Sequence, residues 1–198
     1  MGSFVTEIPI ERAVIEGSES FKSLGGNVFF MTAAALSEAE YNGDSTSIIS
    51  CVVNGRDEAA KMNEVGLIYR TVCILLDFND YGSNDEIIEA VKEQLNYGMA
   101  NIFCMQAYES ENDISDSISF LYQKDIYSLG ELERLVAEEL EFEDDDDASD
   151  SVFEIELIDS TGEDYFTFLV EYDASMYEEE SVERYFNIFC DNVKKLIG

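Results

Sequence analysis

Residues 52–78 read VVNGRDEAAKMNEVGLIYRTVCILLDF and carry the strongest structural signal in this chain. The pattern predicts a strand that ends in Asn54-Gly55-Arg56, then a polar loop, then a second apolar strand that Val65-Gly66 opens. The two runs, 46–54 and 67–78, are rich in β-branched and apolar residues with little alternation, which is typical of strands buried inside a sheet. We therefore expect both runs to be strands of one sheet.

Further helices and strands are predicted on either side of this stretch. Asn27 and Asn84 are the expected N-caps of the first two helices, and Ser160-Thr161-Gly162 is the expected turn of a late hairpin. Helices that alternate with strands, with one hairpin near the end, predict an α/β sandwich with a mixed sheet and a single lobe over residues 1–198. The predicted strands are 46–54, 67–78, 117–123, 152–158 and 165–172, and the predicted helices are 28–41, 84–98 and 178–196.

The charge balance narrows the classes of partner. The chain has 11 basic and 44 acidic residues, which gives a net charge of −33. Such a chain repels phosphate backbones and anionic lipid surfaces, so we expect neither nucleic acid nor membrane partners. No apolar run approaches the roughly 20 residues that span a bilayer, and the first residues do not resemble a signal peptide. The expected location is the cytoplasm.

The residues that usually carry chemistry are scarce. There is no histidine, and the four cysteines (Cys51, Cys73, Cys104 and Cys190) are widely spaced. A zinc site is therefore not expected, and a serine or cysteine nucleophile would lack its usual histidine base. The sequence predicts no catalytic residue and no metal site.

Residues 142–150 form an acidic loop with five consecutive acids at 143–147. Asp145, Asp147, Ser149 and Glu156 fall at calcium-loop positions 1, 3, 5 and 12. Position 6 is Asp150 instead of glycine, however, and a strand follows where the calcium motif needs a helix. We therefore expect a solvated, mobile loop and no calcium site.

The order of these features resembles the C-terminal lobe of a nonribosomal peptide synthetase condensation domain, in the chloramphenicol-acetyltransferase-like superfamily. In that family one strand ends in Gly-Arg, as at Gly55-Arg56. A Val-Gly-x-Phe-Val-Asn-Thr strand follows, which Val65, Gly66 and Thr71 match. The family's Pro-Leu-Phe-Gln strand survives as 120–123, FLYQ. The chain departs from the family where its phenylalanine, asparagine and downstream arginine are Ile68, Arg70 and Leu75.

The resemblance implies a two-layer lobe that pairs with an N-terminal lobe to enclose a tunnel. Peptidyl carrier proteins would deliver phosphopantetheine-tethered substrates into that tunnel for amide-bond formation, and the lobe itself would bind no cofactor. The family's catalytic His-His-x-x-x-Asp-Gly motif lies in the N-terminal lobe, so this histidine-free chain is expected to be an inactive part of an acyltransferase. The resemblance marks these positions as tunnel or structural residues: Gly55, Arg56, Gly66, Arg70, Thr71 and Tyr122.

Each of these positions also has a plain structural interpretation. Arg56 or Arg70 would bind a phosphate or carboxylate in a functional interpretation, and would pair with one of the many acids in a structural one. Gly66 fits a packing residue at a strand start, and Thr71 fits a structural residue within an apolar strand. The alternative function is a free-standing acidic α/β module that binds a protein partner and catalyses nothing.

The net charge leads to a first test. We expect the melting temperature to rise between low and moderate ionic strength, because salt screens the repulsion within a chain of charge −33. Thermal unfolding followed by circular dichroism at several salt concentrations measures this. A melting temperature that does not change with salt would mean that the acids are already paired or widely spread.

Overall fold

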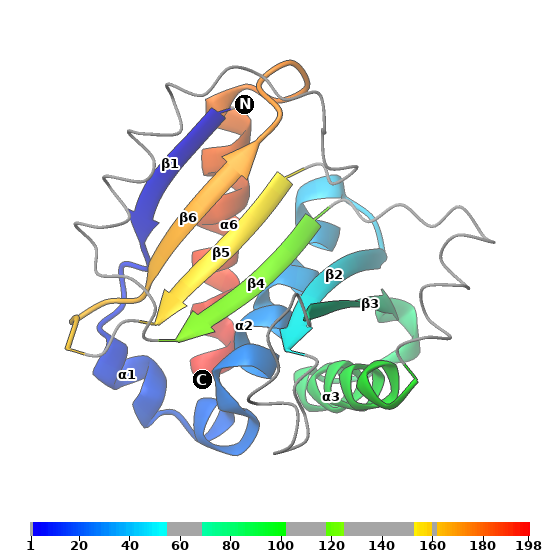
Figure 1. The fold of residues 1–198 in the computed structure, drawn as a ribbon. Helices are drawn as coiled ribbons and strands as arrows, with labels where there is room; N and C mark the ends of the chain where they lie inside the picture. Colours follow the sequence, from blue (N-terminus) through cyan, green and yellow to red (C-terminus); the bar gives the residue numbers. More distant parts are fainter. Residues whose placement is uncertain (1, 55–68, 102–117, 125–152, 160–161) are drawn as a thin grey trace.

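Six strands form one mixed sheet in the computed structural model, which describes residues 2–54, 69–101, 118–124, 153–159 and 162–198 (Figure 1). The strand order is β1-β6-β5-β4-β2-β3. The pairs β2–β4 and β4–β5 are parallel, and the other pairs are antiparallel. The strands are β1 (Gly2–Glu7), β2 (Thr46–Asn54), β3 (Tyr69–Asp77), β4 (Ile118–Lys124), β5 (Phe153–Asp159) and β6 (Thr167–Tyr172).

The long helices pack on one face of this sheet (Figure 1). In the described residues α2 lies against α6, and α3 lies against β3 at the end of the sheet. A short helix, α1, and a 3-10 turn, η2, complete the described elements. The bounds are α1 (Arg12–Gly17), α2 (Glu19–Asn42), η2 (Phe78–Asp80), α3 (Asn84–Ala100) and α6 (Glu179–Ile197).

Aromatic side chains fill the layer between the sheet and the helices. The ring of Phe168 in β6 lies 5.1 Å from the rings of both Phe186 and Phe189 in α6. Phe30 of α2 approaches Phe166 at 4.9 Å, edge to face. Burying one such side chain stabilises a fold by about 1.5–3 kcal/mol. Because side chains alternate along a strand, this packing fixes which face of the sheet meets the helices.

Helix α2 contains a kink that the sequence did not reveal. Ser18 caps the helix, and its hydroxyl accepts a hydrogen bond of 3.2 Å from the Phe21 amide. Gly25 then leaves the helical conformation with φ 75° and ψ 160°. The expected N-cap at Asn27 is therefore wrong, because the helix starts at Glu19, nine residues before the predicted start, and bends at Gly25.

The predicted strands and helices are confirmed wherever the structure describes them. Strand 46–54 has the predicted bounds, and the others differ by at most two residues at a described end. The helix expected at 84–98 runs to Ala100, and its N-cap is Ser83, not Asn84. β1 and α1 were not predicted from the sequence. The acidic loop at 142–150 lies outside the described residues.

Gly25 provides a test of the kink. A β-carbon at Gly25 would meet no atom within 4 Å, so Gly25→Ala would be strained only through its backbone. We expect Gly25→Ala to lower the free energy of unfolding by about 1–3 kcal/mol, since φ 75° with ψ 160° is a conformation for glycine. Chemical denaturation measures the difference.

Gly17→Ala is the matched control, because Gly17 also has open space around its β position and no positive φ. That substitution should be neutral or slightly stabilising. Equal losses for the two variants would contradict the backbone explanation.

Candidate functional site

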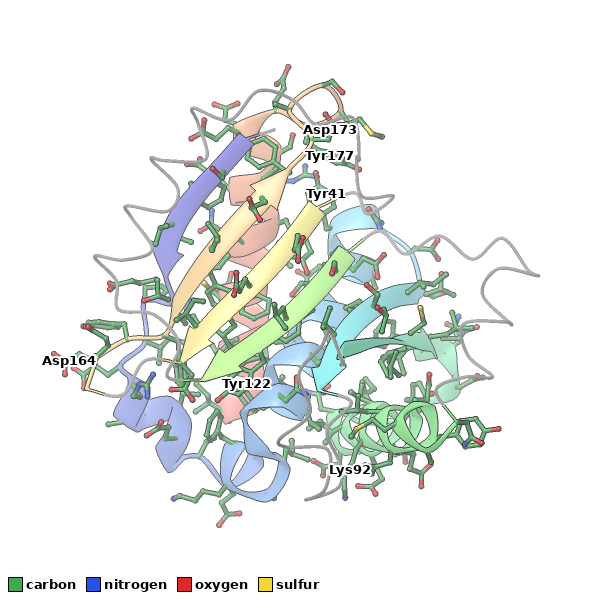
Figure 2. The ribbon with its side chains drawn as sticks, in the orientation of Figure 1. Tyr41, Lys92, Tyr122, Asp164, Asp173 and Tyr177 are labelled. Atoms are coloured by element: carbon green, nitrogen blue, oxygen red, sulfur yellow. The ribbon has the colours of Figure 1, made fainter. Side chains whose placement is uncertain are left out.

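Polar side chains gather where the parallel strands β4 and β5 end. Tyr122 lies near the end of β4 and Asp159 closes β5, and both are on the helix side of the sheet. The Tyr122 hydroxyl donates a hydrogen bond to Asp159 Oδ2. Figure 2 shows Tyr122 between the end of β4 and α2. Carboxyl ends of parallel strands are common places for functional groups, so this cluster is the first candidate.

Arg12 of α1 joins the cluster from the N-terminal segment. Its Nη2 lies 2.6 Å from Asp159 Oδ1, and the Asp159 side chain is only 5% exposed. The contact is an ion pair without aligned hydrogen-bond geometry, since Arg12 Nε, Nη2 and Asp159 Oδ1 make no hydrogen bond in the described part of the chain. The guanidinium also lies 4.4 Å over the ring of Phe166. The cluster thus ties α1 to the end of the sheet.

Gly26, next to the kink of α2, leaves room for Tyr122. A β-carbon on Gly26 would lie 2.6 Å from the Tyr122 hydroxyl, so a larger residue there would force the Tyr122 ring or α2 to shift. The Tyr122 ring stacks on Phe30 with centroids 6.3 Å apart. Burial raises the pKa of Tyr122, and the hydrogen bond to Asp159 raises it further. Tyr122 therefore stays protonated at neutral pH and acts as a hydrogen-bond donor, not as a base.

An open pocket of about 320 Å³ lies beside Arg12. Arg12 pairs with Asp159. The carboxylates around the pocket belong to α1 with its N-cap and to the turn before β6, where Figure 2 labels Asp164. The lining includes no cysteine, and the chain has no histidine, so the ionisable groups that the pocket offers are carboxylates, Arg12 and Tyr165. Its polar lining residues are Glu11, Arg12, Glu16, Glu163, Asp164 and Tyr165.

The face of the sheet opposite the helices, here called the second face, holds another group of predicted residues. Val72 of β3 meets Gly98 of α3 on the helix side, so its neighbour Thr71 points to the second face. Tyr122 points to the helix side, where it stacks on Phe30. The structure therefore does not bring Thr71 and Tyr122 together.

The other predicted site residues are only partly described. The backbone of Arg70 pairs with Val53 in the β2–β3 ladder. Gly55, Arg56 and Gly66 lie outside the described residues, so their roles stay predictions.

The second face carries polar and apolar rows across four strands. One row is Ser119, Glu154, Glu171 and Ser3, in register from β4 to β1, and the next is Leu121, Glu156, Leu169 and Val5. Burial raises the pKa of Glu154, which stands directly across from Glu171.

Two of the cysteines that the structure describes, Cys51 and Cys190, are poor nucleophiles. Burial raises the pKa of Cys51 and of Cys190 to about 12. The thiolate is the reactive form, so these two thiols are inert at neutral pH. Within the described residues no group of three or more acids and cysteines is placed to hold a metal ion, and no helix there is long and apolar enough to cross a membrane.

Arg12 and Asp159 were not predicted as partners. A weak signal existed, because Arg12 is one of only 11 cations and Asp159 ends an apolar strand. Their pairing depends on how α1 docks at the end of β5, and the local sequence pattern does not predict this docking.

Comparisons with proteins of known structure identify the fold. No protein-family model matches the sequence, and neither does any curated protein. The epimerization domain from the third module of tyrocidine synthetase B is similar over 99% of this chain and 47% of that chain, with a TM-score of 0.67 and 15% identity. The first condensation domain of the CDA synthetase is similar over 100% and 46%, with a TM-score of 0.67 and 13% identity.

A third similar structure is a chain in the complex of the X-domain and OxyB from teicoplanin biosynthesis. It has a TM-score of 0.71 and 10% identity, over 99% of this chain and 45% of that chain. The chain thus spans about half the length of the structures it matches. The predicted fold is confirmed: this chain has the α/β fold of one lobe of a condensation domain.

The buried ion pair provides a second mutational test. We expect Asp159→Asn to lower the free energy of unfolding by about 2–4 kcal/mol, because it removes the closer and more buried of the two carboxylates that pair with the largely buried Arg12 and leaves only Glu16, at 3.5 Å. Chemical denaturation measures this loss. Glu89→Gln is the control, because it breaks an exposed pair with Lys92 and should cost at most about 0.5 kcal/mol.

A loss for Asp159→Asn no larger than that for Glu89→Gln would contradict an anchoring role for the Arg12–Asp159 pair.

Proposed function

We propose that this chain is the C-terminal lobe of a condensation domain and forms one wall of a tunnel in which an amide bond is made. The observation that carries the proposal is the match of nearly the whole chain to slightly less than half of such domains. The order of the Gly55-Arg56 and Val65-Gly66 motifs in the sequence supports the C-terminal half.

The second face of the sheet is the surface we assign to the tunnel wall. All the long helices described pack on the other face, so a partner lobe has access to the strands only from this side (Figure 1). Its rows mix serines, carboxylates and apolar side chains, a lining suited to hold an extended substrate arm. Thr71 of β3 would lie in the same wall.

The chemistry would come from the partner lobe. A histidine of that lobe would orient or deprotonate the attacking amine, which no residue of this histidine-free chain can do in the same way. Carrier proteins would deliver the two substrates on phosphopantetheine arms. The contribution of this lobe is to hold donor and acceptor in line, and in general such positioning lowers a barrier by several kcal/mol.

A second candidate is a protein-interaction module with no catalytic role. Two observations favour it. One structure with this fold comes from a complex of the X-domain and OxyB, and this chain is strongly acidic. The two functions differ in whether the lobe pair turns over substrates.

A condensation assay separates them. We expect residues 1–198 alone to form no amide bond between carrier-bound substrates. Addition of an N-terminal lobe that carries His-His-x-x-x-Asp-Gly, in cis or as a separate chain, should create the activity. Replacement of the second histidine of that lobe by alanine should abolish turnover and leave binding between the lobes intact. Mass spectrometry of the carrier-bound product measures each reaction.

Turnover by residues 1–198 alone would contradict the proposal, because the chemistry would then belong to this lobe. Lobes that associate without any turnover would favour the interaction module instead.

A further inference from the structure

The outer edge of β3 is closed by a side chain. β3 is the last strand in the described sheet, so one side of it has no strand partner there. The amide of Gln94 in α3 occupies this side at Leu75. Gln94 Oε1 accepts a hydrogen bond of 2.9 Å from the Leu75 N–H, and Gln94 Nε2 donates one of 2.7 Å to the Leu75 carbonyl. We call this pair of bonds the amide clip.

The amide clip has the hydrogen-bonding pattern of a strand. In an antiparallel pair, a residue donates one hydrogen bond from its N–H and accepts another at its C=O, and both bonds join it to the same residue opposite. A side-chain amide has the same donor and acceptor side by side. Gln94 therefore fills the position at Leu75 that one residue of an added strand would take.

Gly98 allows Gln94 to reach the edge. A β-carbon on Gly98 would lie 2.3 Å from Val72 Cγ1, so α3 can approach β3 this closely only with glycine at that position. Gln94 precedes Gly98 by four residues and lies on the same side of the helix. Close docking at Gly98 therefore brings the Gln94 side chain within reach of the Leu75 backbone.

The rest of the edge favours pairing with another strand. β3 runs for nine residues from Tyr69 to Asp77 and includes the apolar run VCILL at 72–76. The Leu75 side chain is 56% exposed. Long apolar edge strands are templates for strand addition, and proteins usually block them. The partner always available to such an edge is the same edge of a second copy.

We propose that the amide clip closes β3 against antiparallel pairing with β3 of a second copy, and that its removal turns this edge into a dimer interface. Net charge acts in the same direction, because two chains of charge −33 repel each other. The clip matters most where salt weakens that repulsion.

The test compares Gln94→Ala with Met99→Ala in the whole chain at about 0.3 M salt, where the Debye length is short. Met99 is also uncharged and exposed on α3, but it lies on a different flank of the helix. Hydrogen exchange at the Leu75 amide reports the clip, and light scattering after size-exclusion chromatography reports the dimer.

We expect about fivefold or faster exchange at Leu75 in Gln94→Ala, as expected for one lost hydrogen bond. We also expect at least about tenfold tighter self-association than in the wild type. Met99→Ala should match the wild type in both.

A second variant tests where the copies meet. Gln94→Ala/Leu75→Lys should return to the monomer, because a lysine on an edge strand opposes pairing even though it lowers the net negative charge. Gly98→Ala should open the clip as Gln94→Ala does, since it moves α3 away from β3. Unchanged exchange at Leu75 in Gln94→Ala would overturn the clip. Fast exchange in a chain that stays monomeric, or a dimer that survives Leu75→Lys, would overturn the interface.

Discussion

The fold depends on the aromatic contacts that centre on Phe30. Its ring lies against rings from both halves of α2, from β4 and β6, from the turn before β6 and from α6. The nearest is Phe166 at 4.9 Å. One side chain thus links segments from the beginning, middle and end of the chain, so the kink at Gly25, the docking of α6 and the position of β4 are fixed together. The rings around it are Phe21, Phe29, Tyr122, Phe166, Phe168 and Phe189.

The same packing explains which parts of the structure the sequence could predict. The run at 46–54 is apolar and β-branched over its whole length, and α6 has apolar residues at helical spacing, so local pattern was enough for both. β1 has six residues of mixed polarity, and its partner β6 lies at the other end of the chain. α1 is also six residues long and has no side-chain cap. Elements of this kind exist because of distant contacts, and a local pattern does not contain them.

The candidate site likewise has features that the local sequence pattern predicted and features that it did not. Tyr122 was predicted from its motif, but its bond to Asp159 depends on the register of β4 against β5. Thr71 shared a predicted list with Tyr122, and strand alternation puts the two on opposite faces of the sheet. The sequence could thus identify candidate residues within each strand separately. Which of them share a surface was decided by pairing between strands, and the pairing of β4 with its neighbours joins segments far apart in the chain.

The placement of the basic residues decides how much positive charge the described part of this acidic chain can offer to a substrate. Four cations of the described residues pair with acids: Arg12 with the buried Asp159, Lys92 with Glu89, Lys194 with Asp191 and Lys195 with Glu40. Lys22 instead donates to the Gly17 carbonyl, and Arg184 lies over the ring of Tyr41. The charges of the four paired cations are therefore already balanced by neighbouring carboxylates. The chain has no histidine, and burial raises the pKa of Cys51 and of Cys190 to about 12, so neither an imidazole nor these two thiolates is available as a base at neutral pH. Under the proposed function, this lobe would contribute to the reaction by shape and position, and the second face of its sheet would be the surface that the substrate contacts.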